Sequence, residues 1–114
     1  MQIEREVVFP AGPDEVWASL TEAERLEEWF ANDVELDPTP GGAGTFRWDD
    51  GSERHAVVRE AEPNVRLVLD WDDAGTVVLE LEEVEEGTRL RVVETSPEWS
   101  TALELHALAW VPVA

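Results

Sequence analysis

The chain has 114 residues, about the length of one domain, and we expect residues 1–114 to form a single domain. Its 27 acidic residues against 8 basic ones, all of them Arg, give a formal charge of −19. This balance argues against nucleic-acid and membrane partners, because both carry negative charge and attract Lys and Arg. The lack of Cys excludes disulfides, thiol catalysis and Cys-ligated metals. Without an apolar run near about 18 residues or a signal-like start, we expect a soluble cytoplasmic protein.

The first 30 residues predict one strand and two short helices. Residues 2–10 alternate in polarity, which is typical of a strand with one buried face. Apolar residues at helical spacing, with Pro in the first turn, predict a helix over residues 13–20. Thr21 and Glu24 have the spacing of a capping box, so we expect Thr21 to cap a second helix that ends near Phe30.

The middle of the chain predicts an antiparallel meander, because short alternating runs are separated by tight turns. The expected strands are residues 34–36, 45–48, 54–61, 65–71, 76–84 and 88–95. The period then changes, and residues 97–110 predict a last helix of roughly 21 Å, which Pro112 stops. The fold class is therefore α+β: a curved antiparallel sheet with its helices on one side.

The chain resembles the SRPBCC (START-like, Bet v 1-like) superfamily. The resemblance is strongest to its branch of homologues of the activator of heat-shock-protein-90 ATPase. The resemblance covers nearly the whole chain and rests on residues 3–10, 16–17, 20–21, 26–30, 40–46, 60–63, 66–71 and 87–94. It implies a helix-grip fold, in which a curved sheet and a C-terminal helix enclose a hydrophobic cavity. The last helix here is shorter than is usual in this family. Either the cavity is open at one end, or a second copy of the chain covers it as a homodimer.

We expect certain side chains to line the cavity and bind the ligand. This prediction rests on the alternation along the strands and on the expected helix faces. These side chains are Trp17, Trp29, Phe46, Trp48, Val58, Leu69, Trp71, Val77, Leu79, Leu81, Leu90, Val92, Trp99, Leu103, His106 and Trp110. Two interpretations stay open for the tryptophans. They fill a small core, or they line a pocket in which an indole N–H anchors one polar group of a ligand.

Glu94 is the most interesting carboxylate, because its position in the alternation places it on the same face as Leu90 and Val92. Apolar surroundings favour the protonated form of a carboxyl group, which then can act as an acid or base. His106, on the apolar face of the last helix, is a second weak candidate for catalysis. The alternative is that His106 is a packed residue without a catalytic role and that the side chain of Glu94 turns outward at the end of its strand. The His residues lack metal-ligand spacing and the glycines lack a phosphate loop, so we expect neither metal nor cofactor.

Three functions follow as hypotheses. The first is binding of a small hydrophobic molecule without catalysis. The second is an enzyme of the polyketide cyclase/aromatase kind that uses Glu94 and His106. The third, implied by the resemblance alone, is an interaction protein that activates a chaperone ATPase.

Overall fold

The computed structural model describes residues 2–72 and 75–95. These residues form β1 (Ile3–Phe9), α1 (Pro13–Thr21), α2 (Ala23–Trp29), β2 (Asp33–Leu36), β3 (Ala43–Arg47), β4 (Glu53–Glu62), β5 (Arg66–Trp71), β6 (Thr76–Val84) and β7 (Gly87–Glu94). All strands join one antiparallel sheet in the order β1-β7-β6-β5-β4-β3-β2. The α+β class and the curved antiparallel sheet are confirmed. The expected helix over residues 97–110 lies outside the described residues.

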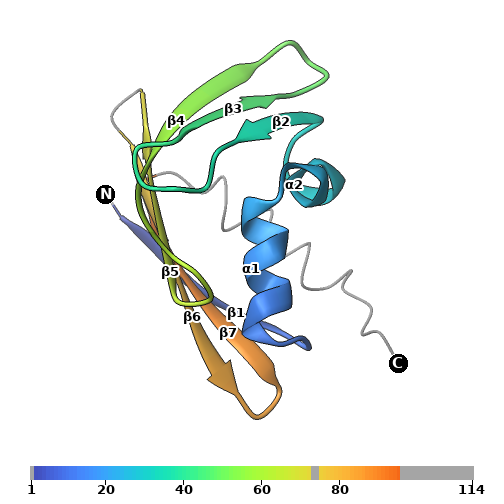
Figure 1. Cartoon of the computed structure of the whole chain (residues 1–114), viewed down its shortest axis with the longest axis vertical. Helices are drawn as coiled ribbons and strands as arrows, with labels where there is room; N and C mark the ends of the chain where they lie inside the picture. Colours follow the sequence, from blue (N-terminus) through green and yellow to red (C-terminus); the bar gives the residue numbers. More distant parts are fainter. Residues whose placement is uncertain (1, 73–74, 96–114) are drawn as a thin grey trace.

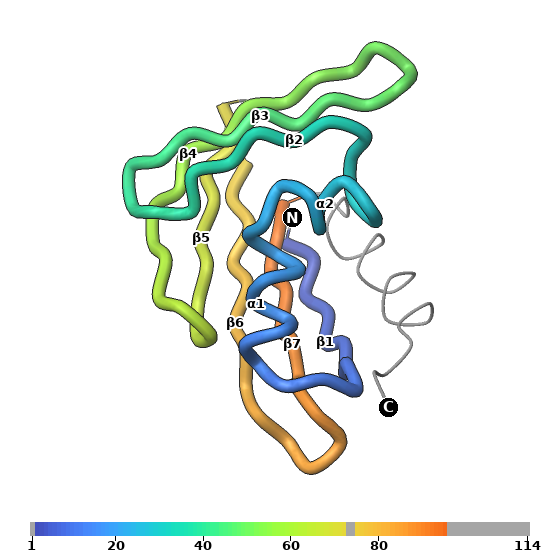
Figure 2. Tube along the Cα trace, turned by 45° about the vertical axis from the view of Figure 1, so that its right-hand side comes forward, coloured from blue at the N-terminus to red at the C-terminus, as the bar shows by residue number. Residues whose placement is uncertain are grey.

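The sheet bends around α1 and α2, which lie on its concave side (Figure 1). Helix α1 packs against β6 and β7, and α2 packs against α1 and β2. Figure 2 shows β2 and β3 crossing one end of the molecule beside α2, while β6 and β7 run behind α1. We call the concave side the inner face and the convex side the outer face.

Alternation assigns the side chains of each strand to these two faces, as the sequence predicts. On β6, Val77, Leu79 and Leu81 are buried, whereas Glu82 is exposed. On β1, Val7 and Phe9 are buried, whereas Glu4, Glu6 and Val8 are exposed. The inner face therefore carries the hydrophobic core, and the outer face carries most of the charge.

The expected capping box at Thr21 is wrong. Thr21 is the last residue of α1, and its hydroxyl donates a hydrogen bond of 2.8 Å to the carbonyl of Trp17, one turn earlier. The N-cap of α2 is Glu22, whose side chain makes no capping hydrogen bond. A threonine hydroxyl can bond back to the preceding turn instead of capping the next helix, and the buried position of Thr21 favours this contact.

The start of β5 also differs from the expected strand. The strand begins at Arg66, and Val65 is 46% exposed in the turn that follows Asn64, whose φ is 66°. The carbonyl of Val65 still accepts a hydrogen bond of 2.8 Å from the Leu81 N–H. Val65 is thus a turn residue beside the sheet and does not belong to its inner face.

The β6–β7 turn contains a glycine that the packing requires. Gly87 has a φ of 140°, and a Cβ atom built there would lie 2.1 Å from the carbonyl oxygen of Phe9 on β1. The Thr88 hydroxyl donates a hydrogen bond of 2.7 Å to the Ala11 carbonyl nearby. These contacts join the β6–β7 hairpin to the segment between β1 and α1, and so fix the edge of the sheet next to the inner face.

Candidate ligand site on the inner face

The inner face is built from rows of side chains that run across the strands. In one row, Glu94 on β7 stands opposite Ile3 on β1 and Val77 on β6, and Val77 stands opposite Leu69 on β5. Leu69 is in turn paired with Val58 on β4. Glu94 is therefore an acidic residue within an otherwise apolar row.

The next row along the strands is similar. Val92 on β7 pairs with Arg5 on β1 and with Leu79 on β6, and Leu79 pairs with Leu67 on β5. Arg5 therefore occupies the position diagonal to Glu94 on the neighbouring strand, at the separation of about 7–8 Å that is usual for such positions. Arg5 itself is exposed, on the edge strand of the sheet.

Most of the candidate ligand residues are buried on this face or packed against it. Phe46, Val58, Leu69, Trp71, Val77, Leu79, Leu81, Leu90 and Val92 belong to the buried core, and the partly buried Trp17, Trp29 and Trp48 pack against it. The remaining candidates, Trp99, Leu103, His106 and Trp110, lie outside the described residues. Glu94 is buried, with 2% of its surface exposed, so its side chain is on the inner face and does not turn outward at the strand end.

Two of the tryptophans use their indole N–H groups inside the protein. Trp29 donates a hydrogen bond of 3.0 Å to the Ser19 carbonyl and so joins α2 to α1. Trp48 donates one of 2.8 Å to the Phe30 carbonyl and so joins the end of β3 to the end of α2. Contact between these two residues and a ligand would therefore be made by their rings.

An aromatic cluster occupies the corner where α2 meets β3, β4 and β5. Phe30 lies edge-on to Phe46 and to Trp48, with ring centroids 5.5 Å apart in both pairs, and Phe46 lies edge-on to Trp71 at 5.4 Å. Edge-to-face pairs of this kind add stability beyond the area that they bury. Sequence reasoning placed Phe30 only on a helix, because the spacing within α2 does not show that its ring reaches β3.

Arg54 is a residue of this corner that sequence reasoning missed. It stands on β4 opposite Phe46, and its guanidinium carbon lies 4.2 Å from the centre of the Trp71 ring. This is within cation–π distance. The signal was present in the sequence, because Arg54 shares the parity of Ala56 and Val58, which are both buried on the inner face.

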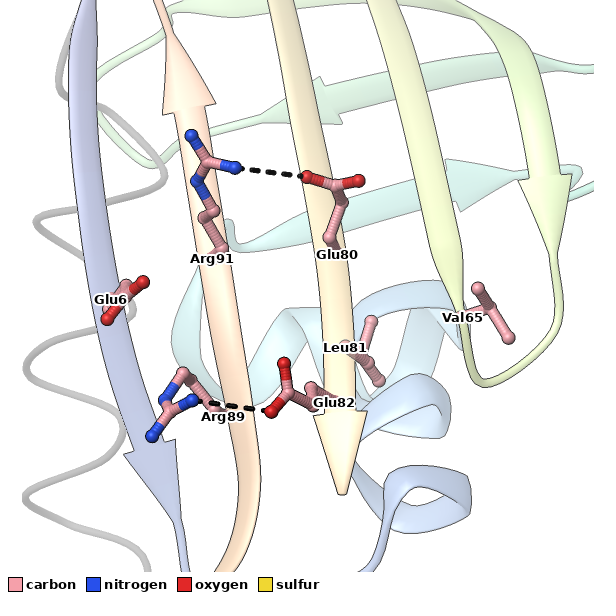
Figure 3. Close-up of a pocket in the computed structure, with 7 residues that line it drawn as sticks. All are labelled: Glu6, Val65, Glu80, Leu81, Glu82, Arg89 and Arg91. Carbon is pink, nitrogen blue, oxygen red and sulfur yellow. Dashed lines mark hydrogen bonds and ion pairs between the residues drawn. The ribbon is translucent and has the colours of Figure 1, made fainter. Parts of the chain in front are cut away.

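The outer face carries a shallow depression of about 410 Å³. Figure 3 shows it with Arg91 directed toward Glu80 and Arg89 toward Glu82; Glu6, Val65 and Leu81 complete its lining. The distances are 3.8 Å for Arg91–Glu80 and 3.3 Å for Arg89–Glu82. Both of its arginines are engaged with carboxylates, and this makes the outer face a weaker candidate for a site than the inner face.

A second outer-face cluster surrounds Glu53. The Arg47 Nε donates a hydrogen bond of 2.6 Å to Glu53, and the His55 Nε2 lies 2.9 Å from the other Glu53 oxygen. These contacts hold the pKa of Glu53 below its ordinary value, and the hydrogen bond with Arg47 has the largest effect. The Thr45 hydroxyl lies 3.3 Å from the His55 Nδ1. The cluster is exposed and lies on regular strands. We therefore assign it a structural role, which is to stabilise the β3–β4 pair at its open end.

Residues 2–72 and 75–95 contain no group of three or more His, Cys, Asp or Glu side chains that is arranged to hold a metal ion. Neither α1 nor α2 is long and apolar enough to cross a membrane.

The fold, together with a match to a protein-family model, defines the class of protein. The family described as Activator of Hsp90 ATPase homolog 1-like protein matches residues 10–110, and the chain belongs to this family. The family is part of the SRPBCC superfamily, as the resemblance in the sequence implied. No curated protein matches the chain significantly.

Solved structures show the same fold at low sequence identity. The Aha1 dimer from Colwellia psychrerythraea has a TM-score of 0.83 and 21% identity, with 96% of this chain and 95% of that chain covered. Protein MLL2253 from Mesorhizobium loti has a TM-score of 0.77 and 23% identity, with coverages of 96% and 88%. DynU16, described as a putative protein in the dynemicin biosynthetic locus, has a TM-score of 0.76 and 24% identity, with coverages of 95% and 44%.

Proposed function

We propose that this protein binds a small hydrophobic molecule on the inner face of its sheet. The observation that carries the proposal is Glu94, a 2%-exposed acidic side chain in a row of apolar side chains. Burying a carboxyl group costs free energy unless hydrogen bonds or charges compensate it, so an acidic side chain is an uncommon choice for an apolar face. In the proposed complex, Glu94 lies on the face that the guest contacts and can interact with a polar group of the guest.

The fold supports this proposal. The chain belongs to a family with the SRPBCC fold, and this fold often binds hydrophobic ligands on the concave side of its sheet. The proposed ligand is flat or aliphatic, because the side chains along β5 and β6 are Leu69, Trp71, Val77 and Leu79. Contact with these side chains would contribute about 25 cal/mol for each Å² of apolar surface removed from water.

The first experiment asks whether a ligand binds. Native mass spectrometry of the purified protein, followed by thermal-shift assays with fatty acids and aromatic polyketides, should give a bound species and a raised melting temperature. A panel that yields no adduct and no stabilisation would overturn the proposal.

A matched pair of variants locates the site. Val92 is on the inner face and Val93, the next residue of β7, is on the outer face. Val92→Phe should fill the guest's space and abolish binding, whereas Val93→Phe should leave binding unchanged. Val92→Leu is a smaller step, which keeps the test valid if the phenylalanine unfolds the protein, since overpacking a solid core costs about 1–3 kcal/mol. Unchanged ligand affinity in Val92→Leu and Val92→Phe would place the ligand elsewhere.

A second candidate function is an enzyme of the polyketide cyclase/aromatase kind. The buried position of Glu94 suits proton transfer, and DynU16, which shares the fold, comes from a biosynthetic locus. In this proposal Glu94 and His106 exchange a proton with the bound molecule. Turnover of a bound polyketide that is lost in Glu94→Gln and in His106→Gln, with Glu82→Gln as the exposed control, would support it. Binding without turnover would indicate a carrier and not an enzyme.

A third candidate is activation of a chaperone ATPase, which the description of the matched family favours. A stimulated rate of ATP hydrolysis by a chaperone of the Hsp90 class, on addition of this protein, would support this function. An unchanged rate at saturating protein would exclude it.

A homodimer is part of the proposal, because the related Aha1 protein from Colwellia psychrerythraea is described as a dimer. In the proposed dimer, a second copy of the chain covers one end of the inner face. Sedimentation equilibrium should give twice the mass of one chain, and a monomer at every concentration would contradict this part.

A further inference from the structure

The indole N–H groups of Trp29, Trp48 and Trp71 are not used in the same way. Trp29 and Trp48 donate theirs to main-chain carbonyls, over 3.0 Å and 2.8 Å. Trp71 is more deeply buried, with 5% of its surface exposed, yet no group within residues 2–72 and 75–95 accepts a hydrogen bond from its indole N–H. Buried indole N–H groups usually have an acceptor, because an unpaired buried donor costs free energy. The N–H of Trp71 therefore requires an explanation.

The ring of Trp71 is held in a fixed orientation. Its centre lies 5.4 Å from that of the Phe46 ring, which packs edge-on, and 4.2 Å from the guanidinium carbon of Arg54. The backbone of Trp71 is fixed as well, because its amide donates a hydrogen bond of 2.7 Å to the Gly75 carbonyl and the residue pairs with Ala56 on β4. A donor on a side chain that is already ordered loses little conformational entropy when it bonds a ligand.

The inner face beside Trp71 is apolar. The preceding inner-facing residue of β5 is Leu69, which pairs with Val58 on β4 and with Val77 on β6, and all three are buried. Their side chains have no polar atom, so they can contact the hydrocarbon part of a ligand but cannot orient it by hydrogen bonds. The indole nitrogen donates and does not accept, so the group that it selects is an acceptor.

The net charge of the chain limits the kind of acceptor. With a formal charge of −19, the protein repels a carboxylate or a phosphate at long range. A neutral oxygen is not repelled in this way, and moving it from water to an apolar face costs far less free energy than moving an ion. An uncharged carbonyl group on an otherwise apolar molecule meets both conditions.

We infer that the hydrophobic ligand carries a neutral carbonyl oxygen and that the indole N–H of Trp71 donates a hydrogen bond to it. The inference rests on the proposed function and deepens it, since it selects oxygenated molecules such as ketones over hydrocarbons of the same shape. It also divides the tryptophans by role. Trp29 and Trp48 join elements of the fold through their N–H groups, whereas Trp71 belongs to the core through its ring and recognises the ligand through its N–H.

The test compares two flat molecules of nearly the same shape, 2-acetylnaphthalene and 2-ethylnaphthalene, of which only the first has a carbonyl. Both displace a neutral fluorescent reporter, N-phenyl-1-naphthylamine, from the full chain. The measured quantity is the ratio of the two affinities in each protein, because the difference in hydration between the compounds is then the same throughout. Trp71→Phe keeps an aromatic ring but removes the N–H, so this ratio should shift against the ketone by about fivefold, the scale of one neutral hydrogen bond.

Trp48→Phe is the matched control. It is the same substitution on the same face, but the N–H that it removes is already donated to the Phe30 carbonyl. Its effect on affinity should fall equally on both compounds, so the ratio should stay at the wild-type value. Retained reporter affinity shows that each variant is folded.

A second measurement needs no variant. In wild-type protein labelled with ¹⁵N, the indole N–H signal of Trp71, assigned through bonds, should move downfield and exchange more slowly with solvent when the ketone binds. The ethyl compound should not have this effect, and the signals of Trp29 and Trp48 should respond alike to both compounds. A Trp71 signal that does not distinguish the two bound compounds, or an unchanged ratio in Trp71→Phe, overturns the inference and leaves the proposed function intact. A wild type that binds neither the reporter nor either compound overturns the proposed function and the inference with it.

Discussion

The inner and outer faces belong to the same strands, yet they are held together by different forces. Along β6 and β7, one set of alternate residues is mostly aliphatic and buried, whereas the other set holds most of the charged residues and is partly or fully exposed. The inner set removes apolar surface from water and so supplies most of the stability. The outer set stays solvated, where ion pairs contribute little individually.

The outer face nevertheless has an organisation of its own. Glu4, Arg91, Glu80, Arg66 and Glu60 form a chain of ion pairs that crosses five adjacent strands, from β1 to β4. The central contacts are 2.8 Å for Arg66–Glu80 and 3.8 Å for Arg91–Glu80. In a chain with 27 acidic residues, placing the arginines between carboxylates reduces like-charge repulsion across neighbouring strands.

The sharpest test of this contrast compares neighbouring residues of β6. Leu79, on the inner face, is fully buried, and Val78, on the outer face, is partly exposed. Leu79→Ala should lower the free energy of unfolding by about 2–5 kcal/mol, because it leaves a cavity in the core. Val78→Ala should cost about 1 kcal/mol or less. Urea denaturation measures both values, and equal losses would contradict the assignment of the two faces.

The tryptophans at the edge of the inner face offer a second test. Trp48→Phe keeps an aromatic ring but removes the N–H that bonds the Phe30 carbonyl at 2.8 Å. The free energy of unfolding should fall by about 1–2 kcal/mol, because the carbonyl loses its partner. Trp29→Phe, which removes the hydrogen bond from the indole N–H to the Ser19 carbonyl, should have a similar effect. Unchanged stability with reduced ligand affinity in either variant would instead assign that indole N–H to the ligand.

The ion pairs of the outer face should give a smaller and salt-dependent effect. Arg91→Met removes the contacts with Glu4 and Glu80, and we expect a loss of about 1 kcal/mol or less in the free energy of unfolding. Arg89→Met, which removes one contact of 3.3 Å, should cost less. The wild-type melting temperature should rise with salt as self-repulsion is screened, while the Arg91→Met difference shrinks. A difference that grows with salt would contradict this interpretation.

The smallest effect concerns the pKa of Glu53. Hydrogen bonds from Arg47 and His55 lower this pKa from its ordinary value of 4.5. The contacts therefore stabilise the fold above pH 4.5 and lose this contribution as the pH falls through the lowered pKa of the folded state. In Arg47→Met, NMR titration should show the pKa of Glu53 closer to its ordinary value.

Asp50 is the internal control in the same spectra. Its pKa is lowered by the side-chain and backbone hydrogen bonds of Ser52, which do not involve Arg47. The pKa of Asp50 should stay low in Arg47→Met. Equal movement of both carboxyl groups would indicate a general change in the field and not a local contact.

Local patterns predicted much of the fold and part of the candidate site. Parity along β7 placed Glu94 with Leu90 and Val92, and the structure shows all three on the inner face. The same rule places Arg54 on the inner face, because Arg54 shares the parity of the buried Ala56. Thr21 shows where a local motif is insufficient, because its capping-box spacing was overridden by a bond within α1.

The sequence by itself determined most of the strands, the face to which most of their residues belong, and the family, because alternation and motif order are properties of neighbouring residues. Only the tertiary structure decided that β1 pairs with β7, that Arg54 lies over Trp71, and that ion pairs cross five strands. Each of these depends on how strands distant in sequence align in one sheet. The free energy that selects such a register is shared among many contacts, so no single stretch of sequence records it.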